Sequence, residues 1–243
     1  MSYGHLVVTA IGLLLCLWAS LRKWPRWAVF VLGAVTLWSG AAFLVARLSL
    51  NVNGRLALPT QQFLVSGEGR VLDMGAGTGR STLMVLEQRP RTTVVALDLF
   101  ADSFNRHFGE GPSGQSRLQA NLQAAGVAQR AAIQTADMRK VPFDPATFDG
   151  VVSTYAIDHL NRDGITQALG EAARVLKPRG EFLLMVIAKD FWLKFTFGPL
   201  LLHSGTRGPE WWANQVRAAG FEIVEEGMRP ATLYVLARKT ALR

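Results

Sequence analysis

A glycine-rich turn with one carboxylate is the segment whose residue types and spacing point most directly to ligand binding. It follows the aliphatic pair Val71-Leu72 and reads Asp73-Met74-Gly75-Ala76-Gly77-Thr78-Gly79. Glycines permit a sharp backbone turn and let a ligand approach where a Cβ atom would collide. A dinucleotide fingerprint, G-x-G-x-x-G, would place its third glycine at position 80, which is arginine. The observed spacing is therefore not that of a dinucleotide site.

Two carboxylates narrow the choice of ligand by their charge and position. Asp73 lies two residues before the first glycine, where it would repel a pyrophosphate but attract a cationic ligand such as the ammonium and sulfonium groups of S-adenosylmethionine. Asp98 ends the aliphatic run of residues 94–97, and its carboxylate can accept two hydrogen bonds from the hydroxyls of a ribose. These charges favour S-adenosylmethionine over a dinucleotide.

A third polar segment, residues 153–160, follows another strand-like run and is a candidate acceptor site. Ligands of open α/β folds bind at the carboxyl ends of the strands. We predict that Tyr155, Asp158 and His159 are catalytic, with His159 a candidate base because its ordinary pKa lies near neutrality. The alternatives are that Asp158 and His159 only begin the next helix and that Tyr155 packs in the core. No His, Cys or Asp cluster has metal-ligand spacing, so no metal is expected.

These residues must be brought together by secondary structure, and the chain from residue 68 onward predicts a sheet. Short β-branched or aliphatic runs alternate with helical stretches, which is typical of a parallel sheet covered by helices. Two final runs, joined by a short turn, predict a closing hairpin. The predicted strands are residues 70–74, 93–97, 132–135, 148–153, 182–187, 222–226 and 232–237, and the predicted helices are residues 80–88, 116–125, 165–176 and 210–219.

The first 50 residues predict a membrane hairpin. Residues 3–21 and 27–46 carry no formal charge, and each run is close to the roughly 20 residues that a helix needs to cross a bilayer. The connector between them, Arg22-Lys23-Trp24-Pro25-Arg26, suits a membrane interface. A cleaved signal peptide is an alternative, although no cationic stretch precedes the first run. The predicted domains are a hairpin at 1–50, a linker or helix at 51–67, and a ligand-binding domain at 68–243.

The composition agrees with one soluble domain and a membrane segment. Hydrophobic residues make up 49% of the chain and charged residues 18%, and the apolar excess lies before residue 50. The single cysteine, Cys16, excludes an intrachain disulfide and a cysteine-based zinc site. The net charge of +8 is scattered, and no RNA-binding module is recognisable, so lipid is a better partner than nucleic acid. Small residues at Gly33, Ser39 and Gly40 suggest a homo-oligomer formed through the hairpin.

The ordered motifs resemble a class I S-adenosylmethionine-dependent methyltransferase, close to the group that includes the ubiquinone-biosynthesis C-methyltransferases. The resemblance covers residues 69–239, including the strand that begins Phe148-Asp149-Gly150, and departs at Arg179, where relatives usually carry glycine. It implies an α/β, Rossmann-like seven-stranded sheet with a final antiparallel strand, preceded here by two transmembrane helices. It also implies S-adenosylmethionine as cofactor and S-adenosylhomocysteine as product. The implied cofactor-binding residues are Asp73, Met74, Gly75, Ala76, Gly77, Thr78, Gly79, Asp98, Leu99, Ala136, Asp137, Met138 and Ser153.

The same resemblance implies roles for two of these positions. Asp98 stands where the family has its ribose-binding carboxylate. Asp137 stands where the family accepts a hydrogen bond from the adenine amino group, with Met138 packing on the ring. The alternative for Asp137 is a helix cap, which is common for an aspartate at the end of a strand.

Residues 190–203 are richer in aromatic side chains and leucines than a surface connection needs. A lid over the acceptor, a second membrane contact and a core helix are the competing interpretations, and Lys194 with Gly198-Pro199 argues against the core helix. A lid or a membrane contact would imply a hydrophobic or amphipathic acceptor. His107 could also border the site.

The sequence therefore predicts a membrane-anchored methyltransferase that acts by in-line displacement on an apolar small molecule or lipid. The alternatives are a non-catalytic S-adenosylmethionine-binding scaffold and a methyltransferase for a membrane protein or RNA. Because the cofactor is intracellular, we expect an integral protein of a bacterial inner membrane with a cytoplasmic catalytic domain. The positive-inside rule would instead place the connector in the cytoplasm, unless the hairpin dips into one leaflet or the second helix lies along the interface.

Overall fold

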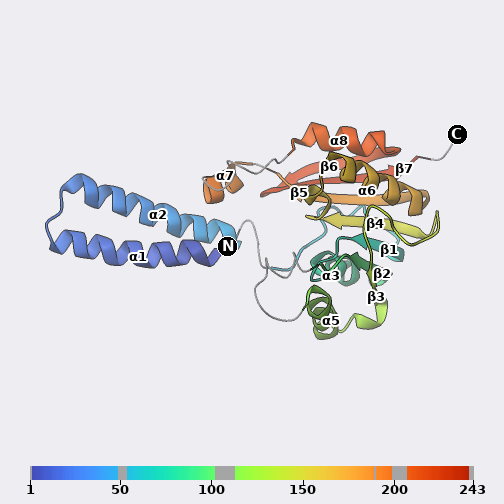
Figure 1. The fold of residues 1–243 in the computed structure, drawn as a ribbon, viewed down its shortest axis with the longest axis horizontal. Coiled ribbons are helices and arrows are strands. Elements are labelled where there is room, and N and C mark those ends of the chain that lie inside the picture. Colours follow the sequence, from blue (N-terminus) through green and yellow to red (C-terminus); the bar gives the residue numbers. More distant parts are fainter. Residues whose placement is uncertain (1, 49–53, 102–112, 189, 199–206, 241–243) are drawn as a thin grey trace. The chain divides into compact units, whose positions relative to one another are not determined.

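The computed structural model describes residues 2–48, 54–101, 113–188, 190–198 and 207–240 (Figure 1). The chain divides into two compact units. The hairpin unit comprises residues 1–54 and 189–205, and the sheet unit comprises residues 55–188 and 206–243. The predicted domain boundaries differ from this division in residues 189–205, which they assign to the ligand-binding domain.

The sheet unit is built on seven strands in the order β3-β2-β1-β4-β5-β7-β6. Strands β1 to β5 pair in parallel, whereas β7 runs antiparallel to both of its neighbours, β5 and β6. The predicted α/β class and the antiparallel final strand are confirmed. The strands are β1 (Glu68–Met74), β2 (Arg91–Asp98), β3 (Ala131–Thr135), β4 (Phe148–Thr154), β5 (Leu176–Ile187), β6 (Phe221–Arg229) and β7 (Thr232–Lys239).

Strand β5 begins earlier than the sequence predicts. The Lys177-Pro178-Arg179-Gly180 segment resembles a turn, but β5 already pairs with β4 at Leu176, opposite Phe148, and resumes pairing at Glu181, opposite Gly150. The intervening residues form a bulge, and Arg179 takes a left-handed backbone conformation with φ of 63°. A bulge of this kind is not visible in sequence periodicity because it leaves both flanking strand segments intact.

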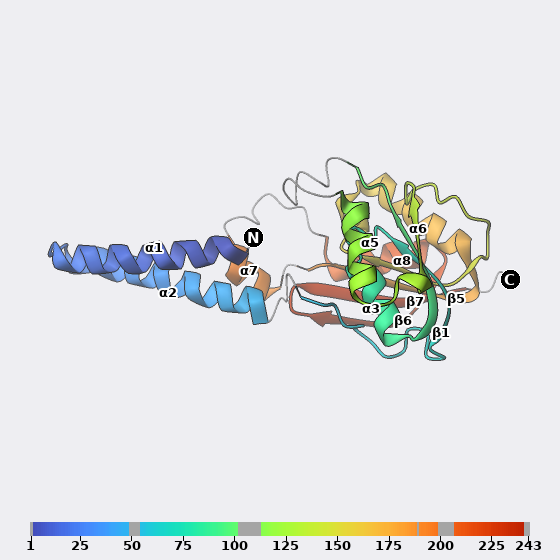
Figure 2. The same cartoon turned by 90° about the horizontal axis from the view of Figure 1, so that it is seen from below.

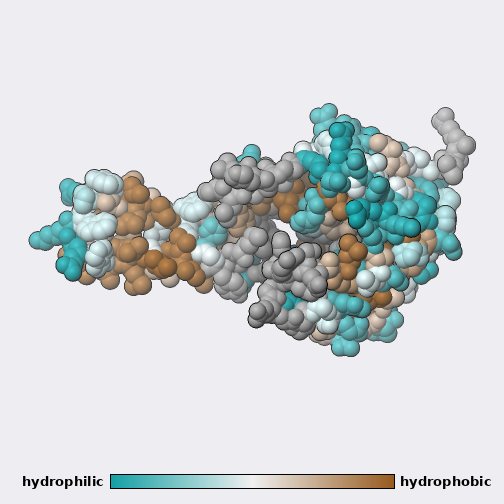
Figure 3. Space-filling view, viewed as in Figure 1, coloured by the Kyte–Doolittle hydropathy of each residue, from teal (hydrophilic) through white to brown (hydrophobic). Residues whose placement is uncertain are grey.

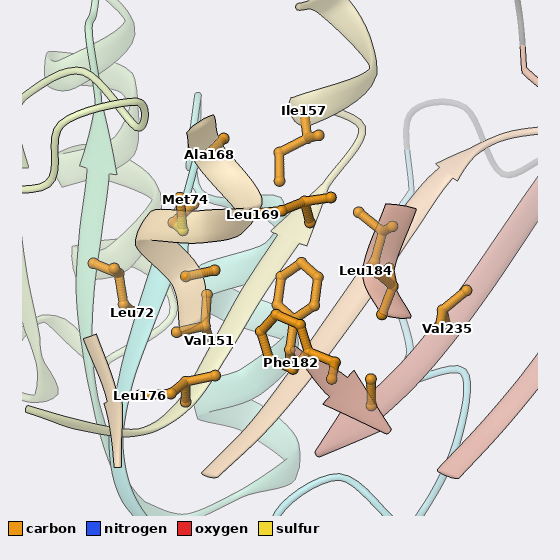
Figure 4. Packing of buried hydrophobic residues seen from close by; sticks show 14 of the residues in the cluster. Leu72, Met74, Val151, Ile157, Ala168, Leu169, Leu176, Phe182, Leu184 and Val235 are labelled. Atoms are coloured by element: carbon orange, nitrogen blue, oxygen red, sulfur yellow. The ribbon is translucent and has the colours of Figure 1, made fainter. Parts of the chain in front are cut away.

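Helices cover both faces of the sheet (Figures 1 and 2). On one face, α6 (Arg162–Val175) and α8 (Pro209–Ala218) pack on a core that includes Leu72, Phe182 and Leu184 (Figure 4). On the other face, α3 (Arg80–Gln88) and α5 (Gly114–Ala124) pack on Val71, Val94 and Val152. Neighbouring strand residues thus point to opposite faces, as a doubly covered sheet requires. Two short 3₁₀ turns, η1 (Ala128–Arg130) and η2 (Ile157–His159), complete the unit.

Residues 54–67 contain no helix and pack against the sheet as an irregular segment. Phe63 is fully buried among the side chains of the α3 face. The buried guanidinium of Arg89 donates to the carbonyl oxygens of Phe63 at 2.7 Å and Gln61 at 2.9 Å. Such hydrogen bonds satisfy backbone groups that a helix would otherwise have paired internally.

The hairpin unit contains α1 (Ser2–Leu21) and α2 (Arg26–Leu48), two helices that are long and apolar enough to cross a bilayer. They meet through small and polar residues. A Cβ atom on Gly12 would overlap the Thr36 hydroxyl, Gly40 faces the Thr9 side chain, and the Ser39 hydroxyl donates to the His5 carbonyl at 2.9 Å. Hydrophobic residues lie along the outer surface of both helices, with hydrophilic residues at the connector end (Figure 3).

A third helix, α7 (Phe191–Phe197), belongs to the hairpin unit. The Trp38 indole N–H donates to the Phe195 carbonyl at 3.0 Å, and the His5 ring contacts both Trp38 and Phe197, with centroids 5.5 and 5.7 Å away. The described part of the predicted lid segment therefore packs on the hairpin, and residues 199–203 of that segment lie outside the described residues.

Candidate active site

The glycine turn links β1 to α3 and is held in a left-handed backbone conformation. Gly75, Gly77 and Gly79 have φ values of 86°, 53° and 93°, which glycine adopts at little cost. The packing around the turn also leaves no room for a side chain at two of these positions. A Cβ atom on Gly75 would overlap Ala156, and one on Gly79 would overlap Leu118. Both the conformation and the close packing explain why glycine occupies these positions.

Asp73 lies fully buried beneath this turn. Its carboxylate accepts hydrogen bonds from the Ser81 hydroxyl at 2.7 and 2.9 Å and from the Thr82 hydroxyl at 2.6 Å. Burial raises the pKa of Asp73 to about 6, while the two hydroxyls lower it. The carboxylate is therefore mostly ionised at neutral pH, and it ties the end of β1 to the first turn of α3.

Asp98 stands at the end of β2, next to the glycine turn. Its two carboxylate oxygens accept hydrogen bonds from the backbone N–H groups of Gly77 and Phe100, both at 2.9 Å. Each carboxylate oxygen can accept a second hydrogen bond. Among the described residues, two acceptor positions therefore remain for the hydroxyls of a ribose, and the neighbouring Leu99 side chain is exposed.

The segment after β3 approaches the same turn. The Ala136 N–H donates to the Asp98 carbonyl at 3.0 Å, and the Met138 methyl would lie 3.0 Å from a Cβ atom on Gly75. Asp137 already binds Arg139, whose guanidinium and backbone N–H donate to its carboxylate at 2.6 to 3.0 Å. This hydrogen bonding lowers the pKa of Asp137. Because Arg139 donates to both carboxylate oxygens, it competes with adenine for the acceptor atoms that the resemblance assigns to that base.

Two hydrogen bonds fasten the turn to neighbouring elements. The buried Ser153 hydroxyl of β4 donates to the Met74 carbonyl at 2.8 Å. The Asn121 side chain of α5 donates to the Thr78 carbonyl at 2.9 Å. The structure thus brings together the predicted cofactor-binding residues from the ends of β1, β2, β3 and β4.

Tyr155 begins the segment after β4 and is mostly buried. Its backbone is left-handed, with φ of 52°, which is costly for a bulky residue and often found at functional sites. Its hydroxyl lies 2.6 Å from the Thr232 hydroxyl of β7. Burial raises the pKa of Tyr155, and the nearby Arg80 guanidinium opposes that increase. The phenol is therefore neutral and available as a hydrogen-bonding group.

Asp158 and His159 lie in η2 and have different surroundings. The Asp158 side chain is largely buried, and burial raises its pKa while the nearby His159 lowers it. Among the described residues, its Oδ1 atom is buried without a hydrogen-bond partner, and its Oδ2 atom accepts from the Ile187 N–H at 3.4 Å. The His159 side chain is exposed. Neither residue begins α6, because Asn161 caps that helix.

Three polar side chains at this edge are not distinguished by the sequence motifs. Ser81 and Thr82 hold Asp73, and Thr232 holds Tyr155. The pair Ser81-Thr82, which follows the glycine turn after Arg80, is a usable sequence signal for a buried partner of Asp73. Thr232 carries no such signal because it lies 77 residues from Tyr155. His107 lies outside the described residues.

The sheet order, the reversed β7 strand and the carboxylate-bearing glycine turn define a class I methyltransferase fold with a site for S-adenosylmethionine. Residues 71–180 match the family described as "Methyltransferase domain". The sheet unit therefore contains a methyltransferase domain, and S-adenosylmethionine is its cofactor. The geometry fits that cofactor, because the described residues leave Asp98 two acceptor positions beside the glycine turn.

Similar proteins include methyltransferases with different acceptors. The Ubiquinone/menaquinone biosynthesis C-methyltransferase UbiE of Paracoccus denitrificans is 30% identical over 115 residues, which are 47% of this chain and 41% of that protein. The Sterol 4-C-methyltransferase strm-1 of Caenorhabditis elegans is 28% identical over 118 residues, 49% of this chain and 31% of that protein. The chain thus spans less than half the length of either relative.

A solved structure has the same fold. It is the 1,6-didemethyltoxoflavin-N1-methyltransferase of Burkholderia thailandensis, determined with 1,6-didemethyltoxoflavin and S-adenosylhomocysteine bound. The two chains are 24% identical, the match covers 73% of each, and the TM-score is 0.54. This likeness supports the arrangement of the sheet unit and does not extend to the acceptor.

Proposed function

We propose that this protein is a membrane-anchored methyltransferase that methylates a hydrophobic or amphipathic small molecule or lipid. The observation that carries the proposal is the combination of two units in one chain. The sheet unit holds a cofactor site around Asp98 and the glycine turn, and the hairpin unit exposes apolar side chains along two helices of membrane-spanning length.

The packing of the hairpin supports a lipid environment. Gly12, Thr36 and Ser39 lie between α1 and α2, whereas leucines, valines and phenylalanines such as Leu14 and Phe30 point outward. A soluble hairpin would bury the large apolar residues instead. Helices in membranes pack through small residues because lipid solvates the large apolar ones.

The cofactor, when bound, supplies a methyl group on a positively charged sulfur. Transfer by in-line displacement would need the acceptor atom to be held in line with that methyl group, and an acceptor that carries a proton at that atom would have to release it. Most of what such a reaction needs from a protein is orientation and exclusion of water. Asp73, Asp98 and the glycine turn hold the cofactor side of the site.

On the acceptor side, Asp158 is a better candidate base than His159. Its buried Oδ1 atom has no hydrogen-bond partner among the described residues, and burial raises its pKa toward the range in which a carboxylate accepts protons. His159 is exposed, which suits a residue that modulates Asp158 through its charge. The neutral hydroxyl of Tyr155, fixed by Thr232, would orient the acceptor.

An apolar acceptor agrees with the names of two relatives, a ubiquinone/menaquinone C-methyltransferase and a sterol 4-C-methyltransferase. Quinones and sterols partition into membranes, where an anchored enzyme would meet them. Because the cofactor is intracellular, the sheet unit is placed in the cytoplasm. The cationic connector of residues 22–26 then lies on the opposite side, against the usual bias of positive charge toward the cytoplasm.

The test is to incubate the purified full chain in detergent with methyl-labelled S-adenosylmethionine and a membrane extract, and then to separate lipid, protein, RNA and water-soluble fractions. Label in the lipid fraction, lost in Asp98→Ala and retained in Asp163→Ala, is the expected result. Label only in water-soluble molecules would overturn the apolar acceptor. Label in protein or RNA would indicate a macromolecular target, and cofactor binding without any transfer would indicate a scaffold.

A further inference from the structure

Helix α7 lies between β5 and α8 in the sequence, yet it packs on the hairpin. Three residues separate the end of β5 at Ile187 from Phe191, the first residue of α7. The helix is nevertheless held by the Trp38 indole and by the His5 ring. The connection that leaves the carboxyl end of β5 is therefore part of the hairpin unit.

The contacts of α7 define its level along the hairpin. His5 lies 16 residues from the end of α1, and Trp38 lies 12 residues from the start of α2, which corresponds to roughly 24 and 18 Å from the connector. Arg47 lies in the last turn of α2, roughly 32 Å from Arg26 at the same rise per residue. Because the hydrocarbon core of a bilayer is about 30 Å thick, α7 falls in the half of the bilayer opposite the connector, between the centre of the core and that interface.

The side chains of α7 have the composition of an interfacial helix. Phe191 and Trp192 are 68% and 41% exposed, and Lys194 is exposed on the same short helix. Tryptophan and phenylalanine are favoured at the boundary between acyl chains and headgroups. A lysine can bury its methylene chain there while its ammonium group reaches lipid phosphates.

We propose that α7 is an interfacial helix that places Phe191 and Trp192 among lipid acyl chains, and Lys194 among headgroups, on the side of the bilayer opposite the connector. The occupant of this surface is the lipid bilayer itself. The proposal rests on the membrane anchoring in the proposed function and deepens it: the segment after β5 is held in the half of the bilayer opposite the connector, so the acceptor is an amphipathic lipid that is reached from that side of the bilayer.

The test uses the full-length protein with Cys16→Ala as background and a nitroxide label on single cysteines, reconstituted in phosphatidylcholine and phosphatidylglycerol vesicles. Labels replace Phe191, Trp192 and two reference residues. Leu14 of α1 is 68% exposed and reports hairpin insertion, and Val65 of the sheet unit is 76% exposed and reports water. Collision rates with oxygen, which concentrates in lipid, and with a water-soluble nickel chelate are then measured by electron paramagnetic resonance.

The expected result is a several-fold higher ratio of oxygen to nickel collisions at positions 14, 191 and 192 than at position 65. A lipid-like label at 14 with water-like labels at 191 and 192 would overturn the placement of α7 and leave the anchor intact. Labels at 191 and 192 that neither reagent reaches would also overturn it, because protein, such as a second copy of the chain, would then cover the helix. A water-like label at 14 would refute the membrane anchor itself.

Discussion

In the sheet unit, Leu72, Phe182 and Leu184 are fully buried, whereas in the hairpin unit Leu14, Phe30 and Leu37 are more than half exposed. The buried residues of α1 and α2 are instead small or polar, namely Ala19, Thr36, Ser39, Ala42 and Ala46. Both units obey the same physical rule, which is that large apolar side chains avoid water. The difference is the one expected if water surrounds the sheet unit and lipid surrounds the hairpin, as proposed above.

The hairpin helices and the sheet unit also differ in their acidic residues. The first 54 residues contain no aspartate or glutamate, whereas the sheet unit buries the carboxylate of Asp73 completely. That carboxylate is stabilised by the hydroxyls of Ser81 and Thr82. A buried carboxylate is costly unless it is hydrogen-bonded, and carboxylates with perturbed pKa values cluster at functional sites.

Replacing phenylalanine in each unit tests the comparison most strongly. Phe182→Ala should lower the free energy of unfolding by about 3–5 kcal/mol, because it leaves a cavity in the core. Phe30 is 76% exposed, so Phe30→Ala should cost less than about 0.5 kcal/mol in detergent, as surface substitutions usually do. Urea unfolding followed by tryptophan fluorescence measures both. Equal losses would mean that protein, and not lipid or detergent, covers Phe30.

The next largest effect concerns the pH dependence caused by Asp73. Its pKa is raised to about 6 from 3.8, so the native state binds the proton more tightly than the unfolded state does. This contribution to stability is complete below about pH 4 and is lost as the pH rises through about 6, a change of about 3 kcal/mol.

Asp73→Asn removes this titration. Relative to the variant, the natural protein should lose stability between pH 4.5 and 7 in the absence of cofactor. Unfolding free energies measured across that range provide the check. Parallel profiles for the two proteins would show that Asp73 titrates near its ordinary pKa. A loss of S-adenosylmethionine affinity at pH 7 in the same variant would support an attraction between the carboxylate and the cationic cofactor.

Asp98→Ala should weaken S-adenosylmethionine binding by about 1–3 kcal/mol, which is the usual effect of removing hydrogen bonds to a charged acceptor. Isothermal titration calorimetry with the purified full chain measures the change. Asp163→Ala is the matched control, because Asp163 is exposed in the first turn of α6 and should leave the affinity unchanged. Equal affinities of the Asp98→Ala and natural proteins would refute the ribose assignment.

Two glycines of the hairpin provide the mildest test. A side chain at Gly12 would overlap Thr36, whereas no atom lies within 4 Å of a Cβ atom on Gly33 among the described residues. Gly12→Val should therefore destabilise the hairpin by about 1–3 kcal/mol through overpacking, and Gly33→Val should not. Thermal unfolding in lipid vesicles compares the two. If Gly33→Val were the more harmful substitution, that face of α2 would be packed against a second copy of the chain.

Local patterns were sufficient to predict several features of this protein. The glycine turn, the alternating strands and the two uncharged runs each depend on residues that are close in sequence, and such periodicities follow from the geometry of strands and helices. The class I fold was implied by the family resemblance that these ordered motifs carry, and the charges of Asp73 and Asp98 favoured the cofactor. The roles of individual site residues stay predictions.

The partners of several side chains depend on contacts between residues that are far apart in the sequence, which local patterns cannot predict. The Trp38 indole binds the Phe195 carbonyl across 157 residues, and the Tyr155 hydroxyl meets Thr232 across 77. The pairing of Asp137 with Arg139 is local, but it depends on side-chain positions that composition does not specify. The same holds for the buried oxygen of Asp158 that has no hydrogen-bond partner among the described residues. Sequence periodicity tells which face of an element is apolar, but only the packed structure decides what that face meets.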